Sequence, residues 1–277
     1  MRRQSISPAS GGFLTVQRGA APLVVAFPHG GSDLAGLDAR FVSPWLAQRD
    51  ADWHIAELYD FVRALGATTV ATRISRAVID VNRDPSGASL YPGQATTELC
   101  PTTTFDGDPL YAGEPPDAGD IDWRRTTFFD PYHAALAAEL ARLRAIHPRV
   151  VLYDAHSIRS RISRLFAGEL PQFNLGTNAG MTCGPELEAA LNEVCAGSGQ
   201  SFVSNGRFKG GWTTRHYGAP RRGVHAVQME LAMRGYLTEP AEPTPQNWPP
   251  PLAAQPQIIP TLQALIGACL TFAKGPA

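Results

Sequence analysis

The feature that most constrains this chain is a series of short apolar runs, each followed by polar residues or a helical pattern. Leu23 to Phe27 is apolar throughout and stops at Pro28, and His29 follows in a Gly-rich turn. Runs of this kind are typical of buried strands. Residues 150–153 form a further apolar run, and another strand is expected around residues 224–231. Because strand candidates alternate with helical patterns, the sequence predicts an α/β sheet with helices on both faces.

Weaker patterns add further expected elements. Short β-branched runs predict more strands, and apolar residues at helical spacing predict the helices. The expected strands are 69–72, 78–81 and 201–203, and the expected helices are 55–65 with Gly66 as the cap, 131–146, 185–194 and 261–272.

Two segments have unusual composition. Residues 82–122 are rich in Pro, Gly, Thr and Asp, and a connection this long is typical of a functional loop. Residues 240–260 hold eight prolines and should form an extended segment before the C-terminal helix. No second strong linker is found, so we predict a single catalytic domain over residues 1–277.

Composition excludes several classes of function. The chain has 24 basic and 25 acidic residues and a net charge of −1, so we expect no nucleic-acid partner. No apolar run approaches the roughly 18 residues of a membrane span, and no apolar core follows the N-terminal arginines as in a secretory signal. The four cysteines lack paired spacing. We therefore expect a cytoplasmic protein without a membrane partner.

The polar residues at the expected strand ends are the candidates for chemistry. In an open α/β sheet, ligands bind at the carboxyl ends of strands, where His29, His156 and Glu230 are expected. Two histidines and a carboxylate form a familiar catalytic zinc shell. Each residue also has a plainer interpretation. His29 could be a hydrogen-bonded surface residue, and Glu230 could point to solvent from an edge strand.

Three arginines could bind an anionic ligand. Arg83 follows an expected strand, where its guanidinium could grip a carboxylate. Arg207 lies in a Gly-flanked segment and Arg215 precedes His216. The alternative for each is a solvated turn. Motifs for a phosphate-binding loop, a dinucleotide site, a helical zinc protease and a serine-hydrolase elbow are absent from the sequence.

Several longer blocks resemble the N-formylglutamate deformylase (N-formylglutamate amidohydrolase) family over about residues 22–236. The blocks are Asp52-Trp53-His54, Ser75-Arg76, Ile79 to Arg83, Leu90 to Gln94, Cys100 to Gly107, Asp154 to Ser160, Asn174 to Asn178, Asn205 to Gly211 and Gly223 to Ala232. So many unusual blocks in one order make the resemblance specific.

The resemblance implies a zinc-dependent enzyme of histidine degradation that hydrolyses N-formyl-L-glutamate to L-glutamate and formate. It also implies a fold like that of zinc carboxypeptidases and aspartoacylase, with a mixed, mostly parallel sheet and one zinc ion, although other divalent metals are possible. The substrate would be a small molecule with two carboxylates. The oligomeric state stays open.

Site residues carried over from the resemblance fall into three groups. The metal ligands are His29, His156 and an acidic residue, and the substrate carboxylates meet Asn82 and Arg83 together with Arg207 or Arg215. Glu230 corresponds to the general base and Arg76 to the arginine that stabilises the developing oxyanion.

In the zinc carboxypeptidases and aspartoacylase, the acidic metal ligand lies three residues after the first histidine, in an H-x-x-E pair. This chain departs from that pattern. The third position after His29 is Ser32, so we expect the acidic ligand at Asp52, with Asp33 as the alternative. Two other functions stay open at this point. One is a zinc-dependent deacylase or carboxypeptidase-like hydrolase of another N-acyl acidic amino acid, and the other is a non-catalytic carboxylate-binding module.

Overall fold

A single seven-stranded sheet organises the computed structural model, which describes residues 12–88, 93 and 96–275. Its order is β1-β3-β2-β4-β7-β5-β6. The strands are β1 (Leu14–Gln17), β2 (Leu23–Phe27), β3 (Thr68–Thr72), β4 (Val150–Ile158), β5 (Phe173–Gly176), β6 (Phe202–Ser204) and β7 (Val224–Ala232). The helices are α1 (Pro44–Gln48), α2 (Ile55–Leu58), α3 (Ala118–Arg124), α4 (Asp130–Arg144), α5 (Pro185–Gly197), α6 (Trp212–Tyr217) and α7 (Ile259–Lys274).

The sheet is mixed and mostly parallel, as expected. β2 pairs in parallel with β3 and β4, and β4 pairs in parallel with β7, so the centre of the sheet is parallel. β5 also pairs in parallel with β6, whereas β1 runs antiparallel to β3 and β5 antiparallel to β7. The carboxyl ends of β2, β4 and β7 therefore lie at one edge of the sheet.

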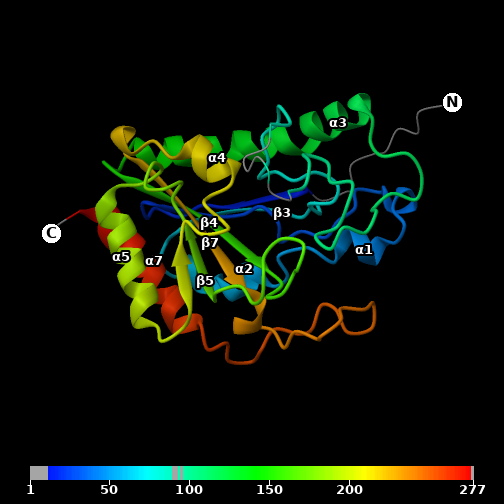
Figure 1. The fold of residues 1–277 in the computed structure, drawn as a ribbon. Helices are drawn as coiled ribbons and strands as arrows, with labels where there is room; N and C mark the ends of the chain where they lie inside the picture. Colours follow the sequence, from blue (N-terminus) through cyan, green and yellow to red (C-terminus); the bar gives the residue numbers. More distant parts are fainter. Residues whose placement is uncertain (1–11, 89–92, 94–95, 276–277) are drawn as a thin grey trace.

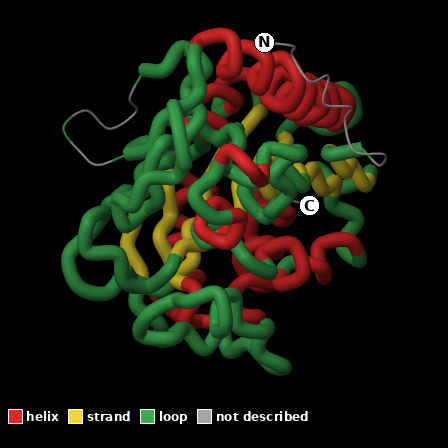
Figure 2. The backbone as a smooth tube through the Cα atoms, turned by 90° about the vertical axis from the view of Figure 1, so that its right-hand side faces the viewer, coloured by secondary structure: helices red, strands yellow, loops and turns green. Residues whose placement is uncertain are grey.

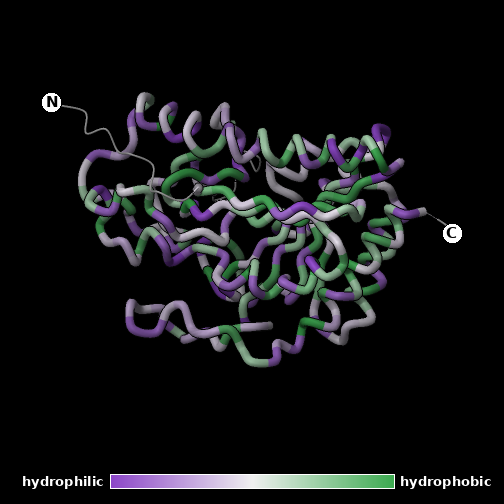
Figure 3. The backbone as a smooth tube through the Cα atoms, turned by 180° about the vertical axis from the view of Figure 1, so that it is seen from behind, coloured by the Kyte–Doolittle hydropathy of each residue, from purple (hydrophilic) through white to green (hydrophobic). Residues whose placement is uncertain are grey.

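Helices cover both faces of the sheet (Figure 1). Side chains along β2 alternate between the two faces. Val24 and Ala26 pack in the core beneath α4, whereas Leu23, Val25 and Phe27 belong to the core that α2, α5 and α7 cover. The α/β architecture with helices on both faces is confirmed. In Figure 3, hydrophobic and hydrophilic stretches alternate along the helices, as expected where only one side faces the sheet.

Two expected elements are wrong in detail. Residues 78–81 form turns instead of a strand, and the backbone N–H of Val78 donates to Ser75. Val78 and Ile79 are nevertheless fully buried. A β-branched run is as typical of a buried segment as of a paired strand, which explains the wrong prediction. The expected helix over 55–65 divides into α2 and a 3₁₀ turn, Asp60–Arg63. Gly66 ends it with a positive φ of 73°, as a C-terminal cap requires.

Loops gather on the side of the molecule that faces the viewer in Figure 2. The expected loop 82–122 is irregular up to α3, and within it the block Leu90–Gln94 lies, apart from Gly93, outside the described residues. Residues 240–258, before α7, form no helix or strand and include turns at 245–247 and 257–258, and Trp248 anchors this segment by donating to the carbonyl of Arg49 (2.8 Å). No helix in the described part of the chain is long and apolar enough to cross a membrane.

Candidate active site

Three segments far apart in the sequence bring His29, Asp52 and His156 together. His29 follows the end of β2, and its carbonyl accepts a hydrogen bond from the backbone N–H of Asp52 (3.0 Å). His156 lies within β4, which is five residues longer than the apolar run alone predicts. The backbone N–H of Ser157 donates to the Asp52 carboxylate (3.1 Å). Backbone contacts therefore fix Asp52 between the other two segments.

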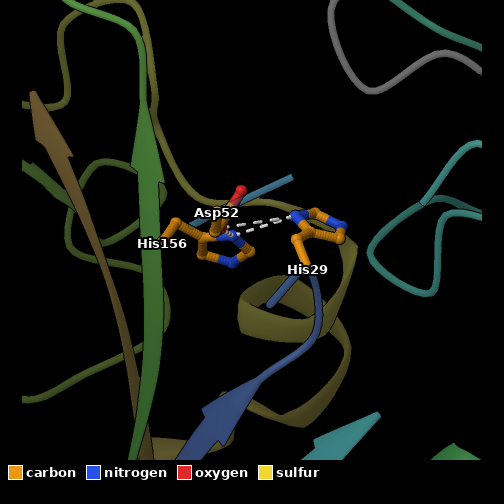
Figure 4. Close-up of side chains that lie close together, drawn as sticks. All are labelled: His29, Asp52 and His156. Atoms are coloured by element: carbon orange, nitrogen blue, oxygen red, sulfur yellow. Dashed lines mark hydrogen bonds and ion pairs between the residues drawn. The ribbon is translucent and has the colours of Figure 1, made fainter. Parts of the chain in front are cut away.

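These three side chains point toward one another and are buried (Figure 4). The Nδ1 atoms of the two rings lie 3.1 Å apart, and Nδ1 of His156 lies 3.2 Å from Oδ2 of Asp52. One ligand atom from each residue falls within 4.8 Å of the others, so this group could hold a metal ion. The structure thus brings together the metal-ligand candidates expected from the sequence, with Asp52 in the acidic position.

Asp33, the alternative acidic ligand, lies outside this group. Its carboxylate accepts from the N–H of Ala35 (2.8 Å) and lies 3.9 Å from Arg73. One third of its side chain is exposed. It caps a local turn.

Two further carboxylates hold the outer nitrogens of the histidine rings. Nε2 of His29 lies 2.7 Å from Asp80, and Nε2 of His156 lies 3.0 Å from Asp154. Carboxylates in this position fix the ring tautomer of metal-binding histidines and make the ligand nitrogen more basic. Sequence reasoning did not assign Asp80 or Asp154 this role. The available signal was that each is an acidic residue beside other candidate site residues in the sequence.

The electrostatics of the group favour a positive charge at its centre. Burial and the nearby Arg76 lower the pKa of His29, which favours the neutral form of this ring. For His156, burial opposes the charged form, but Asp154 and Asp52 together raise its pKa well above the ordinary value. Oδ1 of Asp52 is buried without a hydrogen-bond partner. Two imidazole nitrogens and a carboxylate oxygen this close together fit a divalent metal such as zinc.

Glu230 lies beside this group on β7, an interior strand of the sheet. Its backbone pairs with that of His156 in β4, and the residue is only 7% exposed. An edge strand that points Glu230 to solvent is therefore excluded. Burial raises the pKa of Glu230 to about 7. A carboxyl group with a pKa near neutrality can both accept and return a proton.

Arg76 connects the histidine group to a pocket. One of its terminal nitrogens lies 2.7 Å from Asp80 and the other 3.6 Å from Asp52. Its guanidinium also lies 4.7 Å from the centre of the Phe105 ring. These contacts hold a cation at the pocket wall close to the histidines.

The pocket has a cationic and partly apolar lining. Its walls include both histidines, Glu230, Gln228, Arg76, Asn82, Arg83, Arg207, Thr97, Phe105, Ile158, Leu165 and Phe208. The loop after Asn82 supplies Thr97 and Phe105, so this irregular segment is part of the site.

The three expected substrate arginines do not share one position. Arg83 donates to the carbonyl and the hydroxyl of Thr97 (both 3.1 Å), and Arg207 donates to the carbonyl of Leu165 (2.9 Å). Both line the pocket. Arg215 donates to the carbonyl of Gly210 and is not among the residues that line it.

Asn82 lines the pocket, but its amide makes contacts within the protein. Oδ1 accepts from the backbone N–H of Thr213 (2.8 Å), and Nδ2 donates to Asp154 (3.2 Å). Nδ2 also lies 3.0 Å from Nε2 of His156, so this amide contacts the histidine group, and the role of Asn82 in gripping a substrate carboxylate stays a prediction.

The chain is similar in sequence to known proteins of one family. The family model described as N-formylglutamate amidohydrolase matches residues 21–237. An N-formylglutamate deformylase of Pseudomonas aeruginosa is 50% identical over 231 residues, covering 82% of this chain and 86% of the relative. One of Pseudomonas putida is 45% identical over 262 residues, covering 94% and 96%.

A solved structure supports the fold. The crystal structure of an N-formylglutamate amidohydrolase from Ralstonia eutropha superposes with a TM-score of 0.73 at 24% identity, covering 92% of this chain and 96% of that one. The match of the family model over most of the sequence and the two relatives at 45–50% identity show that the chain is an enzyme that belongs to the N-formylglutamate amidohydrolase family.

Proposed function

We propose that this chain hydrolyses N-formyl-L-glutamate to formate and L-glutamate with one divalent metal ion, zinc being the expected ion. The observation that carries the proposal is the buried group of His29, Asp52 and His156 beside Glu230, at the base of a pocket lined by three arginines. The names of the relatives at 45–50% identity support the choice of substrate.

Each residue has a separate task in this proposal. His29, Asp52 and His156 hold the metal, which when bound supplies Lewis acidity toward the substrate carbonyl and water. Glu230 accepts a proton from the attacking water and passes it to the nitrogen that leaves. Water thus adds across the C–N bond, its oxygen to the formyl carbon and a proton to the amine. Arg76 offsets the negative charge that develops on the formyl oxygen.

The arginines of the pocket support a substrate with two carboxylates. Arg83 and Arg207 both line the pocket and carry guanidinium groups that can pair with carboxylates. A substrate with one carboxylate would engage only one of these two arginines. We therefore propose Arg83 and Arg207 as the two anchors. A single domain, a cytoplasmic location and a place in histidine degradation complete the proposal.

Formate release from N-formyl-L-glutamate tests the proposal directly. The assay is run on the purified chain as prepared, after chelation, and after zinc is added back. We expect release that chelation abolishes and zinc restores. N-acetyl-L-glutamate, N-formyl-L-glutamine and a peptide ending in glutamate are run in parallel. Faster turnover of any of these would replace the proposed substrate, and chelator-resistant release would exclude the metal.

A further inference from the structure

Gln228 holds Glu230 through a hydrogen bond on the face of β7 that lines the pocket. The two residues are two positions apart on the strand, so their side chains point to the same face. Nε2 of Gln228 donates to Oε2 of Glu230 (3.1 Å). Oε1 of Gln228 accepts from the backbone N–H of Gly211 (2.7 Å). Because a backbone N–H can only donate, this contact fixes which end of the amide faces Glu230.

The side-chain amide of Asn82 is oriented in the same way, by the backbone N–H of a residue two positions after Gly211. Its Oδ1 accepts from the N–H of Thr213, which turns Nδ2 toward Asp154. The same oxygen of Asp154 lies 3.0 Å from Nε2 of His156. Residues 211–213, which we call the anchor segment, therefore orient two buried amides. One of them faces the expected base and the other faces the carboxylate that holds a histidine.

The anchor segment is itself closely confined. A Cβ atom at Gly211 would lie 2.4 Å from Nδ2 and 2.6 Å from Oδ1 of Asn82, so only glycine allows this approach. Gly210 has a φ of 107°, a conformation that glycine tolerates. The segment also follows Arg207 by four residues, so it continues the loop that carries an arginine of the pocket.

We propose that Gln228 is a positioning residue for Glu230, oriented for this task by the anchor segment. The proposal rests on the proposed function in so far as Glu230 acts as the base. With Oε2 engaged by Gln228, the proton of the attacking water is taken at Oε1. Without the Gln228 amide, the carboxylate can turn away from the water. A misplacement of about 1 Å can lower a rate by about 10²-fold.

The first test compares Gln228→Met with a matched control, Gln172→Met. Gln172 is also buried, and its Nε2 donates to the carbonyl of Ala232 (2.8 Å). Both substitutions remove a buried amide, but only one removes a contact to Glu230. For Gln228→Met we expect kcat on N-formyl-L-glutamate to fall by about 10²-fold while KM stays within about threefold. Gln172→Met should lower the melting temperature with kcat unchanged.

A second variant, Gln228→Glu, tests the proposal if Gln228→Met does not fold. Gln228→Glu keeps an acceptor for the Gly211 N–H but replaces the donor toward Glu230 with an oxygen. We expect the same loss of kcat at neutral pH with little change in KM. A kcat within about twofold of the wild type in a folded variant overturns the proposal. A rise in KM that matches the fall in kcat also overturns it, because Gln228 would then bind substrate.

An NMR measurement tests the hydrogen bonds without turnover. In nitrogen–proton correlation spectra, Glu230→Gln should shift the side-chain NH₂ signals of Gln228, and Gln228→Met should shift the backbone signal of Gly211. Unmoved signals overturn the positioning role. If the wild type does not release formate from N-formyl-L-glutamate while these signals shift as expected, the proposed function fails and the hydrogen-bonded arrangement stands.

Discussion

His29 and His156 face each other with their Nδ1 atoms 3.1 Å apart, while a carboxylate holds the Nε2 atom of each ring. A carboxylate at Nε2 favours the proton on that nitrogen, so Nδ1 is the nitrogen of each ring that would give its lone pair to a metal ion, which in His156 would replace a proton. The two lone pairs and the Asp52 carboxylate then meet at one point. The inward orientation of both rings is thus set by Asp80 and Asp154, which lie outside the ligand group.

Metal content should depend on Asp52 and not on Asp33. We expect one zinc ion per chain in the wild type and in Asp33→Asn, and loss of the metal in Asp52→Ala, measured by elemental analysis. Chelation should also lower the melting temperature of the wild type by about 10 °C, because bound metal stabilises the folded state. Retention of metal in Asp52→Ala together with its loss in Asp33→Asn would exchange the roles of the two residues.

Asp80→Asn should weaken metal binding without removing a ligand. Its carboxylate contacts Nε2 of His29 and pairs with Arg76, so the substitution loosens the ring that presents Nδ1. Outer carboxylates of this kind contribute about 10–100-fold to metal affinity. Competition with a chromophoric chelator measures the change. An affinity equal to that of the wild type would show that Asp80 serves its other partners, Arg76 and Arg83, and not the metal ligand.

Sequence patterns predicted the placement of residues that lie in a strand or directly after one. His29 was predictable because an apolar run ends directly before it, and Glu230 because it lies in a run that forms β7. The strand over residues 78–81 was wrong because the run is buried in a turn, where its backbone pairs with Ser75 and Leu99 instead of with another strand. The apolar character of residues 78–81 indicated that they are buried, but it did not indicate which residues their backbone would hydrogen-bond to.

Residues whose role depends on distant segments were not predictable in this way. Asp80 meets His29 across 51 positions, and Gln228 meets Gly211 across 17 positions. Neither contact follows a periodic pattern, because each is created by the way the loops meet at the edge of the sheet. For the same reason, the sequence could not decide whether Arg207 or Arg215 faces the substrate. In the structure, Arg207 lines the pocket and Arg215 is not among the residues that line it.

Arg207→Ala should weaken substrate binding far more than Arg215→Ala. The loss of a charge-assisted hydrogen bond costs about 1.5–3 kcal/mol, so we expect KM for N-formyl-L-glutamate to rise by about 10–100-fold. Arg215→Ala should stay within about threefold. Steady-state kinetics with N-formyl-L-glutamine as a second substrate supply the control, because Arg207→Ala should reduce the preference for two carboxylates. Equal KM values in the two variants would remove Arg207 as an anchor.

Glu230→Gln should separate metal binding from turnover. The amide keeps the shape of the side chain but cannot accept the proton, so we expect kcat to fall by about 10²–10⁴-fold with the metal retained. The matched control is Glu139→Gln on α4, a buried carboxylate that pairs with Arg142 (2.7 Å) away from the pocket. This control should lower stability and leave kcat unchanged. Near-normal turnover in Glu230→Gln would reject its role as the base.

His133 should make the free energy of unfolding depend on pH. The ring is buried against Phe129 and Trp212, and its Nε2 donates to the carbonyl of Val81 (2.7 Å). Burial lowers the pKa of His133 to about 4, against an ordinary value of about 6.5. Between these values the unfolded chain binds more protons than the folded one. The stabilisation is therefore complete above about pH 6.5 and is lost as the pH falls toward 4.

Urea unfolding of the metal-free protein at pH 7 and pH 5 measures this contribution. Between these values the wild type should lose about 2 kcal/mol more than His133→Gln, in which the titrating ring is absent. The control is His147→Gln, because the ring of His147 lies half-exposed after the end of α4 and contacts only the carbonyl of Ala20 among the hydrogen bonds described. That variant should follow the wild-type dependence. If His133→Gln loses as much stability as the wild type, the pH dependence arises from groups other than this ring.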